Sequence, residues 1–438
     1  MISWSKQKTE LASGDVSEAD LFEATLKRIH VDTQYKAWNW TYDSYDAAMA
    51  QRPRATVPGF DDLTGLHLAV KDIYNSITGT TEMGSASWAG HTAGNDARVL
   101  AEFIYNGATM VGKTKTAEFA VHALPDTLNP WNVDVTPGTS STGSAVAVAL
   151  GHVPVALGTQ TAGSITRPAS FCSVIGYKPT QGIHPRTAVL KTCDPFDTVG
   201  CFASSLDDLP VLFEATRVRG DNYPIVERRL LPAYDKARDG SKLRIGVVQS
   251  PCSNQEETSI TQAVQGFVDG LPKDRFHVQP VDLIQVLAGV GQMHDNIYNK
   301  SLSYYFQPER AKGETFSKVL EEIFVLGDGV STEEYRSNLV ALPDIRNRVA
   351  EQIADFDLLI APSTATVAPK RGEMEREDTS RFWTLLHFPT VSLPLFQDSA
   401  SGLPFGVQII GARKFSDPLV FEFLKAAQLD DSALVKYR

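Results

Sequence analysis

Cysteine is scarce in this sequence. Its 438 residues include four cysteines, Cys172, Cys193, Cys201 and Cys252, and no two of them form a Cys-x-x-Cys pair. Four cysteines in a chain of this length do not make a disulfide framework, and none has a histidine at zinc-finger spacing. We therefore expect reduced thiols in a cytoplasmic protein that binds no metal and no cofactor.

Long hydrophobic runs and an excess of positive charge are also missing. No apolar stretch is long enough to cross a bilayer, and the N-terminal residues MISWSKQKTELASGDVSEADL lack the apolar segment of a signal peptide. The 52 acidic residues exceed the 41 lysines and arginines, which gives a net charge of −11. This balance argues against a nucleic-acid partner and against an anionic membrane surface.

Short apolar runs alternate with amphipathic stretches along the chain. The pattern predicts strands near residues 65–71, 108–114, 153–160, 243–249, 357–363 and 404–412, and helices near 18–30, 95–107, 143–151 and 282–306. Alternation of this kind indicates an α/β fold, with a mixed and mostly buried central sheet flanked by helices on both faces. Residues 209–240 are charged and rich in proline, so we expect them to leave the core.

One stretch matches a nucleotide-binding motif in its residue types but not in its predicted structure. GATMVGKT, Gly107 to Thr114, matches G-x-x-x-x-G-K-[ST]. A phosphate-binding loop needs a strand before its first glycine and a helix after its lysine. Here the predicted helix precedes Gly107, and the residues that follow resemble a strand. We interpret the motif as a helix end leading into a core strand, and a nucleotide-binding protein remains a lesser alternative.

Candidate catalytic residues occur at three places. Lys71 ends the apolar run LAVK, Ser140 and Ser141 lie in a Gly/Ser-rich stretch, and Ser164 lies in GTQTAGS. A serine nucleophile needs a base, and a buried lysine can serve because burial disfavours the ammonium form. Taken alone, Lys71 is more typical of an ion-paired lysine. Small residues around Ser164 would let backbone N–H groups converge on one point.

Together these pieces resemble the amidase signature family. Residues 137–180 read PGTSSTGSAVAVALGHVPVALGTQTAGSITRPASFCSVIGYKPT, which is similar to the family's signature in order and without gaps. Flanking pieces such as GLHLAVKD and DTVGCFASSLDD are also similar. The resemblance extends over most of residues 17–425 and is weaker in 210–380. It implies one amidase domain over 1–438, with a catalytic core at 17–210 and 340–425 and a variable specificity region at 211–339.

The resemblance also implies a Ser–Ser–Lys triad. Lys71 matches the base, Ser140 the bridging serine beside a cis peptide bond, and Ser164 the nucleophile. The backbone N–H groups of Thr161, Ala162, Gly163 and Ser164 would form the oxyanion hole. The implied activity is hydrolysis of the C–N bond of a small carboxamide through a Ser164 acyl-enzyme.

Three positions depart from the commoner family pattern. Thr139 stands where glycine is usual, Gln160 replaces an aspartate, and Arg167 lies three residues after the nucleophile instead of two. These features resemble a subgroup that includes malonamidase- and biuret-type hydrolases. We assign Arg167, Gln160 and Ser141 to substrate binding, with Arg167 orienting an acidic end of the substrate. The alternative is a structural arginine that ties the loop to a carboxylate.

A rival interpretation keeps the same triad. An amidotransferase A-type subunit would release ammonia from glutamine and pass it to a partner protein. Gln160 argues against this alternative, because such subunits usually have an aspartate at that position. A catalytically silent scaffold is disfavoured by the intact Lys71, Ser140 and Ser164. We expect a small-molecule amide as the binding partner, and a homodimer is one option for assembly.

Overall fold

The computed structural model describes residues 2–50, 63–218 and 241–437. Within them, an 11-stranded sheet has the order β1-β3-β2-β4-β6-β5-β10-β11-β9-β7-β8. The strands are β1 Trp38–Thr41, β2 His67–Lys71, β3 Thr109–Thr114, β4 Val155–Gln160, β5 Ile175–Lys178, β6 Thr198–Ala203, β7 Leu243–Gln249, β8 Phe276–Asp282, β9 Leu358–Pro362, β10 Thr390–Gln397 and β11 Pro404–Gly411. Strand β2 runs parallel to β3 and β4, while β4 and β6 are antiparallel, so the sheet is mixed as expected.

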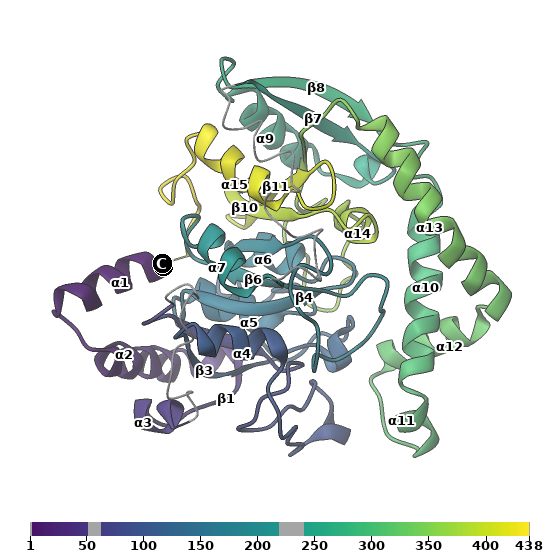
Figure 1. The fold of residues 1–438 in the computed structure, drawn as a ribbon. Coiled ribbons are helices and arrows are strands. Elements are labelled where there is room, and N and C mark those ends of the chain that lie inside the picture. Colours follow the sequence, from purple (N-terminus) through teal and green to yellow (C-terminus); the bar gives the residue numbers. More distant parts are fainter. Residues whose placement is uncertain (1, 51–62, 219–240, 438) are drawn as a thin grey trace.

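Helices surround the sheet (Figure 1). They are α1 Trp4–Ser13, α2 Glu18–Val31, α3 Tyr45–Met49, α4 Arg98–Tyr105, α5 Thr142–Ala149, α6 Thr166–Cys172, α7 Asp208–Thr216, α9 Thr258–Asp269, α10 Val290–Tyr305, α11 Gln307–Ala311, α12 Lys318–Gly329, α13 Thr332–Gln352, α14 Ser380–Leu385 and α15 Asp417–Ala426. Short 3₁₀ helices lie at Thr33–Tyr35, Ala86–Trp88, Glu118–Ala120 and Ser253–Gln255. Ser17 caps α2, where its hydroxyl accepts a hydrogen bond from the Asp20 N–H.

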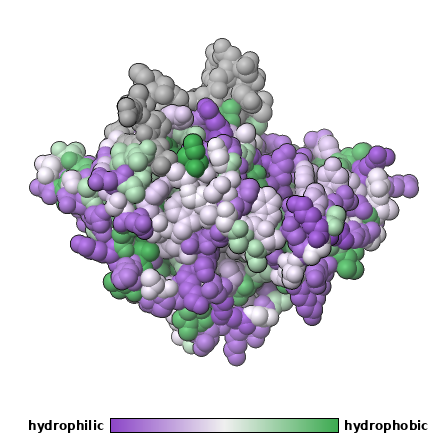
Figure 2. Space-filling model, turned by 90° about the horizontal axis from the view of Figure 1, so that it is seen from below, coloured by the Kyte–Doolittle hydropathy of each residue, from purple (hydrophilic) through white to green (hydrophobic). Residues whose placement is uncertain are grey.

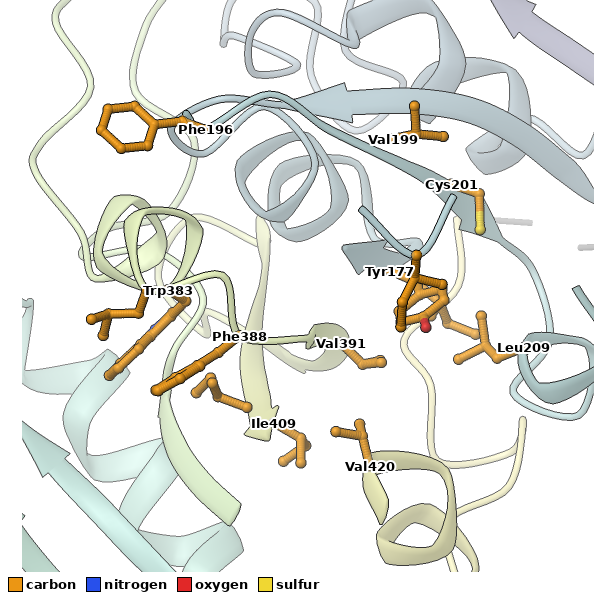
Figure 3. Close-up of a cluster of buried hydrophobic side chains, with 14 of the residues drawn as sticks. Tyr177, Phe196, Val199, Cys201, Leu209, Trp383, Phe388, Val391, Ile409 and Val420 are labelled. Atoms are coloured by element: carbon orange, nitrogen blue, oxygen red, sulfur yellow. The ribbon is translucent and has the colours of Figure 1, made fainter. Parts of the chain in front are cut away.

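Side chains of the central strands alternate between two hydrophobic clusters. Leu68 and Leu157 belong to a large cluster, whereas Ala69 and Ala156 belong to a second cluster shared with α5. Successive side chains of a strand point to opposite faces, so the two clusters lie on the two faces of the sheet. Figure 3 shows part of the large cluster, with side chains from strands, α7 and α15. The expected fold class is confirmed.

Helix α5 lies very close to its neighbours because its side chains are small. All of its eight residues are buried. A Cβ atom at Gly143 would lie 2.2 Å from the carbonyl oxygen of Ala37 and 2.6 Å from the backbone nitrogen of Lys115. No side chain fits there, so the glycine sets how closely α5 approaches the segments around β1 and β3. This close packing fixes the loop that precedes α5.

The segment 211–339 contributes both to the sheet and to a group of helices beside it. Strands β7 and β8 extend one edge of the sheet, and α10, α12 and α13 stand together at one side of the molecule (Figure 1). The helix predicted from residue 282 begins only at Val290. Residues 284–289 form turns, and Gly289 has a φ of 74°, which a helix cannot continue.

The expectation that residues 209–240 leave the core is wrong for their first part. Helix α7 is packed into the large cluster, and its Leu209, Leu212 and Phe213 are buried. Apolar side chains at these positions outweigh the charges nearby. Residues 219–240 lie outside the described residues.

Hydrophilic residues predominate on the face shown in Figure 2, where hydrophobic residues occur in small scattered groups. In the described part of the chain, no helix is both long enough and apolar enough to pass through a bilayer.

Candidate active site

The candidate residues meet where two parallel strands end. Strands β2 and β4 pair in parallel, with Val70 opposite Leu157, so their carboxyl ends lie at the same edge of the sheet. Lys71 is the last residue of β2, and β4 ends at Gln160, directly before the loop 161–165. The chain before α5 brings Ser140 and Ser141 to the same place. Topology therefore gathers segments that are 24 to 93 residues apart in the sequence.

Lys71 is completely buried among hydroxyl groups. Its Nζ atom donates hydrogen bonds to Ser140 Oγ at 2.8 Å, to Ser141 Oγ at 3.0 Å and to Thr159 Oγ1 at 2.9 Å. Burial lowers the pKa of Lys71 to about 7, against the charge of Asp197, which raises it. The amine therefore has a substantial neutral fraction near neutral pH.

The backbone around Ser140 is held from several sides. The peptide bond between Thr139 and Ser140 is cis, which matches what the family resemblance implied. The carbonyl oxygen of Ser140 accepts hydrogen bonds from the Ala117 N–H at 3.1 Å and from Thr116 Oγ1 at 3.2 Å. Thr139, the unusual residue of this loop, is buried and compatible with this conformation.

Ser164 lies in the loop between β4 and α6. It is 6% exposed, and its hydroxyl makes no hydrogen bond with any described residue, Ser140 included. The backbone N–H groups of Ala162, Gly163 and Ser164 likewise donate to no acceptor within the described parts of the chain. Buried N–H groups without an acceptor are rare in proteins. Three in a row beside a serine hydroxyl form a place where an oxyanion could be bound. The N–H group of Thr161, the fourth one expected there, also has no acceptor among the described residues, and Thr161 is partly exposed.

Two of the expected substrate ligands are used inside the protein. Ser141 Oγ accepts from Lys71 and donates to the carbonyl oxygen of Thr159 at 3.1 Å. Gln160 Oε1 accepts from the N–H groups of Ile165 and Thr166, both at 2.9 Å, and its Nε2 donates to Thr384 Oγ1 at 3.0 Å. Both side chains are buried. These contacts support the loops that carry Ser140 and Ser164.

Arg167 is held by two carboxylates. Its Nε donates to Asp378 Oδ2 at 2.5 Å, and its Nη1 lies 3.4 Å from Glu375 Oε2. Burial disfavours the charged form of Arg167, but Asp378 and Glu375 more than offset this and raise its pKa above the ordinary value. The geometry favours the alternative left open by the sequence, a structural arginine that ties the loop to a carboxylate.

Asp197 supports the same loop and was not singled out from the sequence. Its carboxylate accepts from Thr161 Oγ1 at 2.7 Å, from Arg186 Nη1 at 2.8 Å and from the backbone of Thr192 and Cys193. It belongs to the stretch DTVG, one of the flanking pieces that resemble the family, so a signal was present. Thr159, in GTQT, was missed in the same way.

The nucleotide-binding motif forms no phosphate site. Lys113 lies in β3 and is fully buried, with its Nζ bonded to the carbonyl oxygen of Tyr74 and, at 2.8 Å, to Thr81 Oγ1. Its Nζ also lies 3.5 Å from Asp72 Oδ1. These contacts explain the motif as part of the core. In the ranges that the structure describes, no cluster of histidine, cysteine and acidic side chains could hold a metal ion.

Comparison with known proteins identifies the family of this chain. A family model described as Amidase matches residues 20–421. The A-type subunit of the glutamyl-tRNA(Gln) amidotransferase of Anaeromyxobacter sp. (strain K) is 28% identical, covering 95% of this chain and 94% of its own. A solved structure of a vestigial protein complex, described as revealing the origins of an s-triazine catabolic enzyme, has a TM-score of 0.86 at 24% identity and covers 100% of both chains.

A further solved structure has the same fold. The peptide amidase of Stenotrophomonas maltophilia aligns with a TM-score of 0.79 at 23% identity, covering 98% of this chain and 97% of that one. At such identities the structural likeness concerns the fold, whereas the family model spans most of the sequence. The chain belongs to the amidase family.

Proposed function

We propose that this protein is an amidohydrolase that cleaves the C–N bond of a small carboxamide through an acyl-enzyme on Ser164, with Ser140 and Lys71 as a proton relay. The observation that carries the proposal is the buried Lys71, whose pKa is lowered to about 7 by burial and whose Nζ lies 2.8 Å from Ser140 Oγ. A neutral amine in this position can act as a base.

Hydrogen-bond counting supports the direction of the relay. A neutral Lys71 has two N–H donors and one lone pair, facing three hydroxyl oxygens. The proton of Ser141 is directed at the carbonyl oxygen of Thr159, so Ser141 accepts from Lys71. The remaining N–H and the lone pair face Thr159 and Ser140. We assign the lone pair to Ser140, which passes its proton to Lys71 and takes one from Ser164 once the Ser164 hydroxyl turns toward it.

The acyl transfer follows with balanced protons. Ser164 Oγ attacks the amide carbon, and the N–H groups of Ala162, Gly163 and Ser164 stabilise the negative oxygen of the tetrahedral intermediate. The relay returns its proton to the leaving nitrogen, and the C–N bond breaks to give ammonia or an amine. Water then attacks the ester on Ser164 with the relay as base, which releases the acid and restores the serine.

The substrate need not carry an acid group. Arg167, the cation expected to recognise a carboxylate, already faces Asp378 and Glu375. These two carboxylates already pair with the guanidinium group, so it is not available to a substrate carboxylate. We therefore propose a small neutral amide as the preferred substrate class.

A second candidate is supported by the relatives. The curated protein from Anaeromyxobacter is named as part of an amidotransferase, so glutamine is a candidate ammonia source for this chain as well. The same triad would serve. Ammonia release from free glutamine that rises when a co-purified partner protein is present would favour this function over a stand-alone amidase.

A screen of amides tests the proposal. Ammonia release is measured with glutamine, malonamate-like, biuret-like and simple aryl amides, for the wild type, Ser164→Ala and Ser432→Ala. Ser432 is exposed and makes its side-chain contact with Asp430 in the C-terminal segment, so it is a matched control. We expect Ser164→Ala to abolish the activity and Ser432→Ala to keep it. Release that is unchanged in Ser164→Ala would refute the mechanism, and a fluorophosphonate adduct on Ser164 would support it.

A further inference from the structure

Three consecutive carbonyl groups before Ser164 are all engaged. The Thr161 oxygen lies 2.9 Å from Nε2 of His294, the Ala162 oxygen accepts from Thr384 Oγ1 at 3.0 Å, and the Gly163 oxygen accepts from the Arg167 N–H at 2.9 Å. The third bond belongs to the start of α6. The first two come from helices α10 and α14, which are far away in the sequence.

These bonds determine where the opposite N–H groups point. In a trans peptide unit the C=O of one residue and the N–H of the next lie in one plane and point in opposite directions. A carbonyl that is held outward at Thr161 therefore turns the Ala162 N–H the other way, and the same applies to Ala162 and Gly163. These are two of the N–H groups that have no acceptor among the described residues.

We propose that His294 and Thr384 are positioning residues that aim the N–H groups of Ala162 and Gly163 at the oxyanion formed on Ser164. The inference rests on the proposed amidohydrolase function and adds to it two residues outside the triad. Neither residue touches the reacting atoms, and both act through the carbonyl groups that they hold.

Aromatic side chains hold His294 in place for its contact with the Thr161 oxygen. It is 2% exposed and stacks on Phe196 at a centroid distance of 4.7 Å with an interplanar angle of 12°. The ring of Tyr298 also stacks on it, with the two centroids 5.9 Å apart. A carbonyl can only accept, so Nε2 carries the hydrogen. Nδ1 makes no hydrogen bond with the described residues and lies 3.5 Å from Asp295 Oδ1.

Thr384 supports the second carbonyl. Its oxygen accepts from Gln160 Nε2 at 3.0 Å, and its proton is within reach of the Ala162 oxygen at 3.0 Å and the Ser380 oxygen at 3.1 Å. Gln160 in turn accepts from the N–H groups of Ile165 and Thr166. The glutamine found in place of the family's commoner aspartate thus links α14 to the nucleophile loop through an amide donor, which a carboxylate lacks.

Paired substitutions test the positioning role by kinetics. His294→Phe keeps a ring between Phe196 and Tyr298 but removes the donor, whereas His294→Gln keeps an N–H donor at a similar reach. Because loss of one oxyanion contact costs about 100-fold or more in kcat, we expect His294→Phe to lower kcat by about 100-fold, with KM changed by less than about threefold. His294→Gln is expected to recover most of kcat. Thr384→Val and Thr384→Ser should behave as the second such pair.

The outcomes separate this inference from the proposed function. A folded His294→Phe that keeps wild-type kcat, or a Gln variant no better than the Phe variant, would overturn the positioning role while leaving the triad intact. If no amide is hydrolysed in a Ser164-dependent way, the proposed function fails, and a crystal structure of His294→Phe decides the inference by itself. The peptide plane between Thr161 and Ala162 should then be rotated, and an unchanged plane would refute the role.

Discussion

The Nζ atom of Lys71 lies 2.8 Å from Oγ of Ser140, and both residues are buried. An ammonium group in such a site has lost its hydration and is surrounded by neutral hydroxyl groups. Its protonation therefore becomes sensitive to pH in the physiological range, unlike that of an exposed lysine.

The rate should rise with pH through about 7. Below the lowered pKa of about 7, Lys71 carries a proton and cannot accept another, so kcat/KM for a neutral amide should fall about tenfold per pH unit. Above it, the amine is neutral and the rate should level off. A pH profile from about 5.5 to 9 measures this. Lys71→Arg, which stays charged throughout, should be inactive at every pH, and a flat wild-type profile would contradict a neutral lysine base.

Replacing two glycines by alanine should change the free energy of unfolding in opposite directions. Gly143→Ala places a Cβ 2.2 Å from the Ala37 oxygen, so we expect it to lower the free energy of unfolding by about 1–3 kcal/mol. Gly266 lies in α9 with no atom within 4 Å of such a Cβ, so Gly266→Ala should raise it by about 0.5–1 kcal/mol. Urea denaturation of both variants tests this, and a stabilised Gly143→Ala would contradict the close approach.

Lys113 should matter for stability and not for nucleotide binding. Lys113→Met leaves the buried Asp72 without its cation, so we expect a loss of about 3–5 kcal/mol in the free energy of unfolding. A second change, Asp72→Asn, should recover part of that loss. ATP with magnesium should not shift the melting temperature of the wild type. A shift that disappears in Lys113→Met would instead revive a nucleotide site.

Arg167→Ala should affect acidic and neutral amides equally. Since the guanidinium group braces the loop through Asp378 and Glu375, its removal should lower kcat/KM by about 10- to 100-fold for both kinds of substrate. Steady-state kinetics with a matched pair, a small amide with and without a carboxylate, gives the comparison. A KM increase confined to the acidic amide would restore direct carboxylate recognition by Arg167.

Much of the fold was predictable because its signals are local. Strands β2, β3 and β4 are fully buried and contain short apolar runs, and the predicted boundaries agree with the structure to within about two residues. Strands β1, β5, β6, β8 and β10 were not predicted. For β5 and β6, antiparallel pairing with β10 and β4 respectively holds the strand in place. Such tertiary pairing leaves little trace in a window of residues.

The candidate site likewise contains residues with a local sequence signal and residues without one. Lys71 and the serine loops lie in contiguous stretches whose residue types indicate their chemistry. His294, Thr384 and Asp378 reach the loop across 133, 222 and 211 residues of sequence, and nothing near them marks the contact.

Helix α10 has a consequence for laboratory evolution of this protein. Its first turns bring His294 to the nucleophile loop, and its last residue, Tyr305, hydrogen-bonds to Asp194, three residues before the Asp197 that holds Thr161. A graft that exchanges residues 290–305 for those of another amidase would replace the contacts that His294 and Tyr305 make with the segments around Ser164. The turnover of chimeras made to alter substrate specificity should therefore be measured as well. Retaining His294 and Tyr305 within the graft is the simplest way to change specificity without changing turnover.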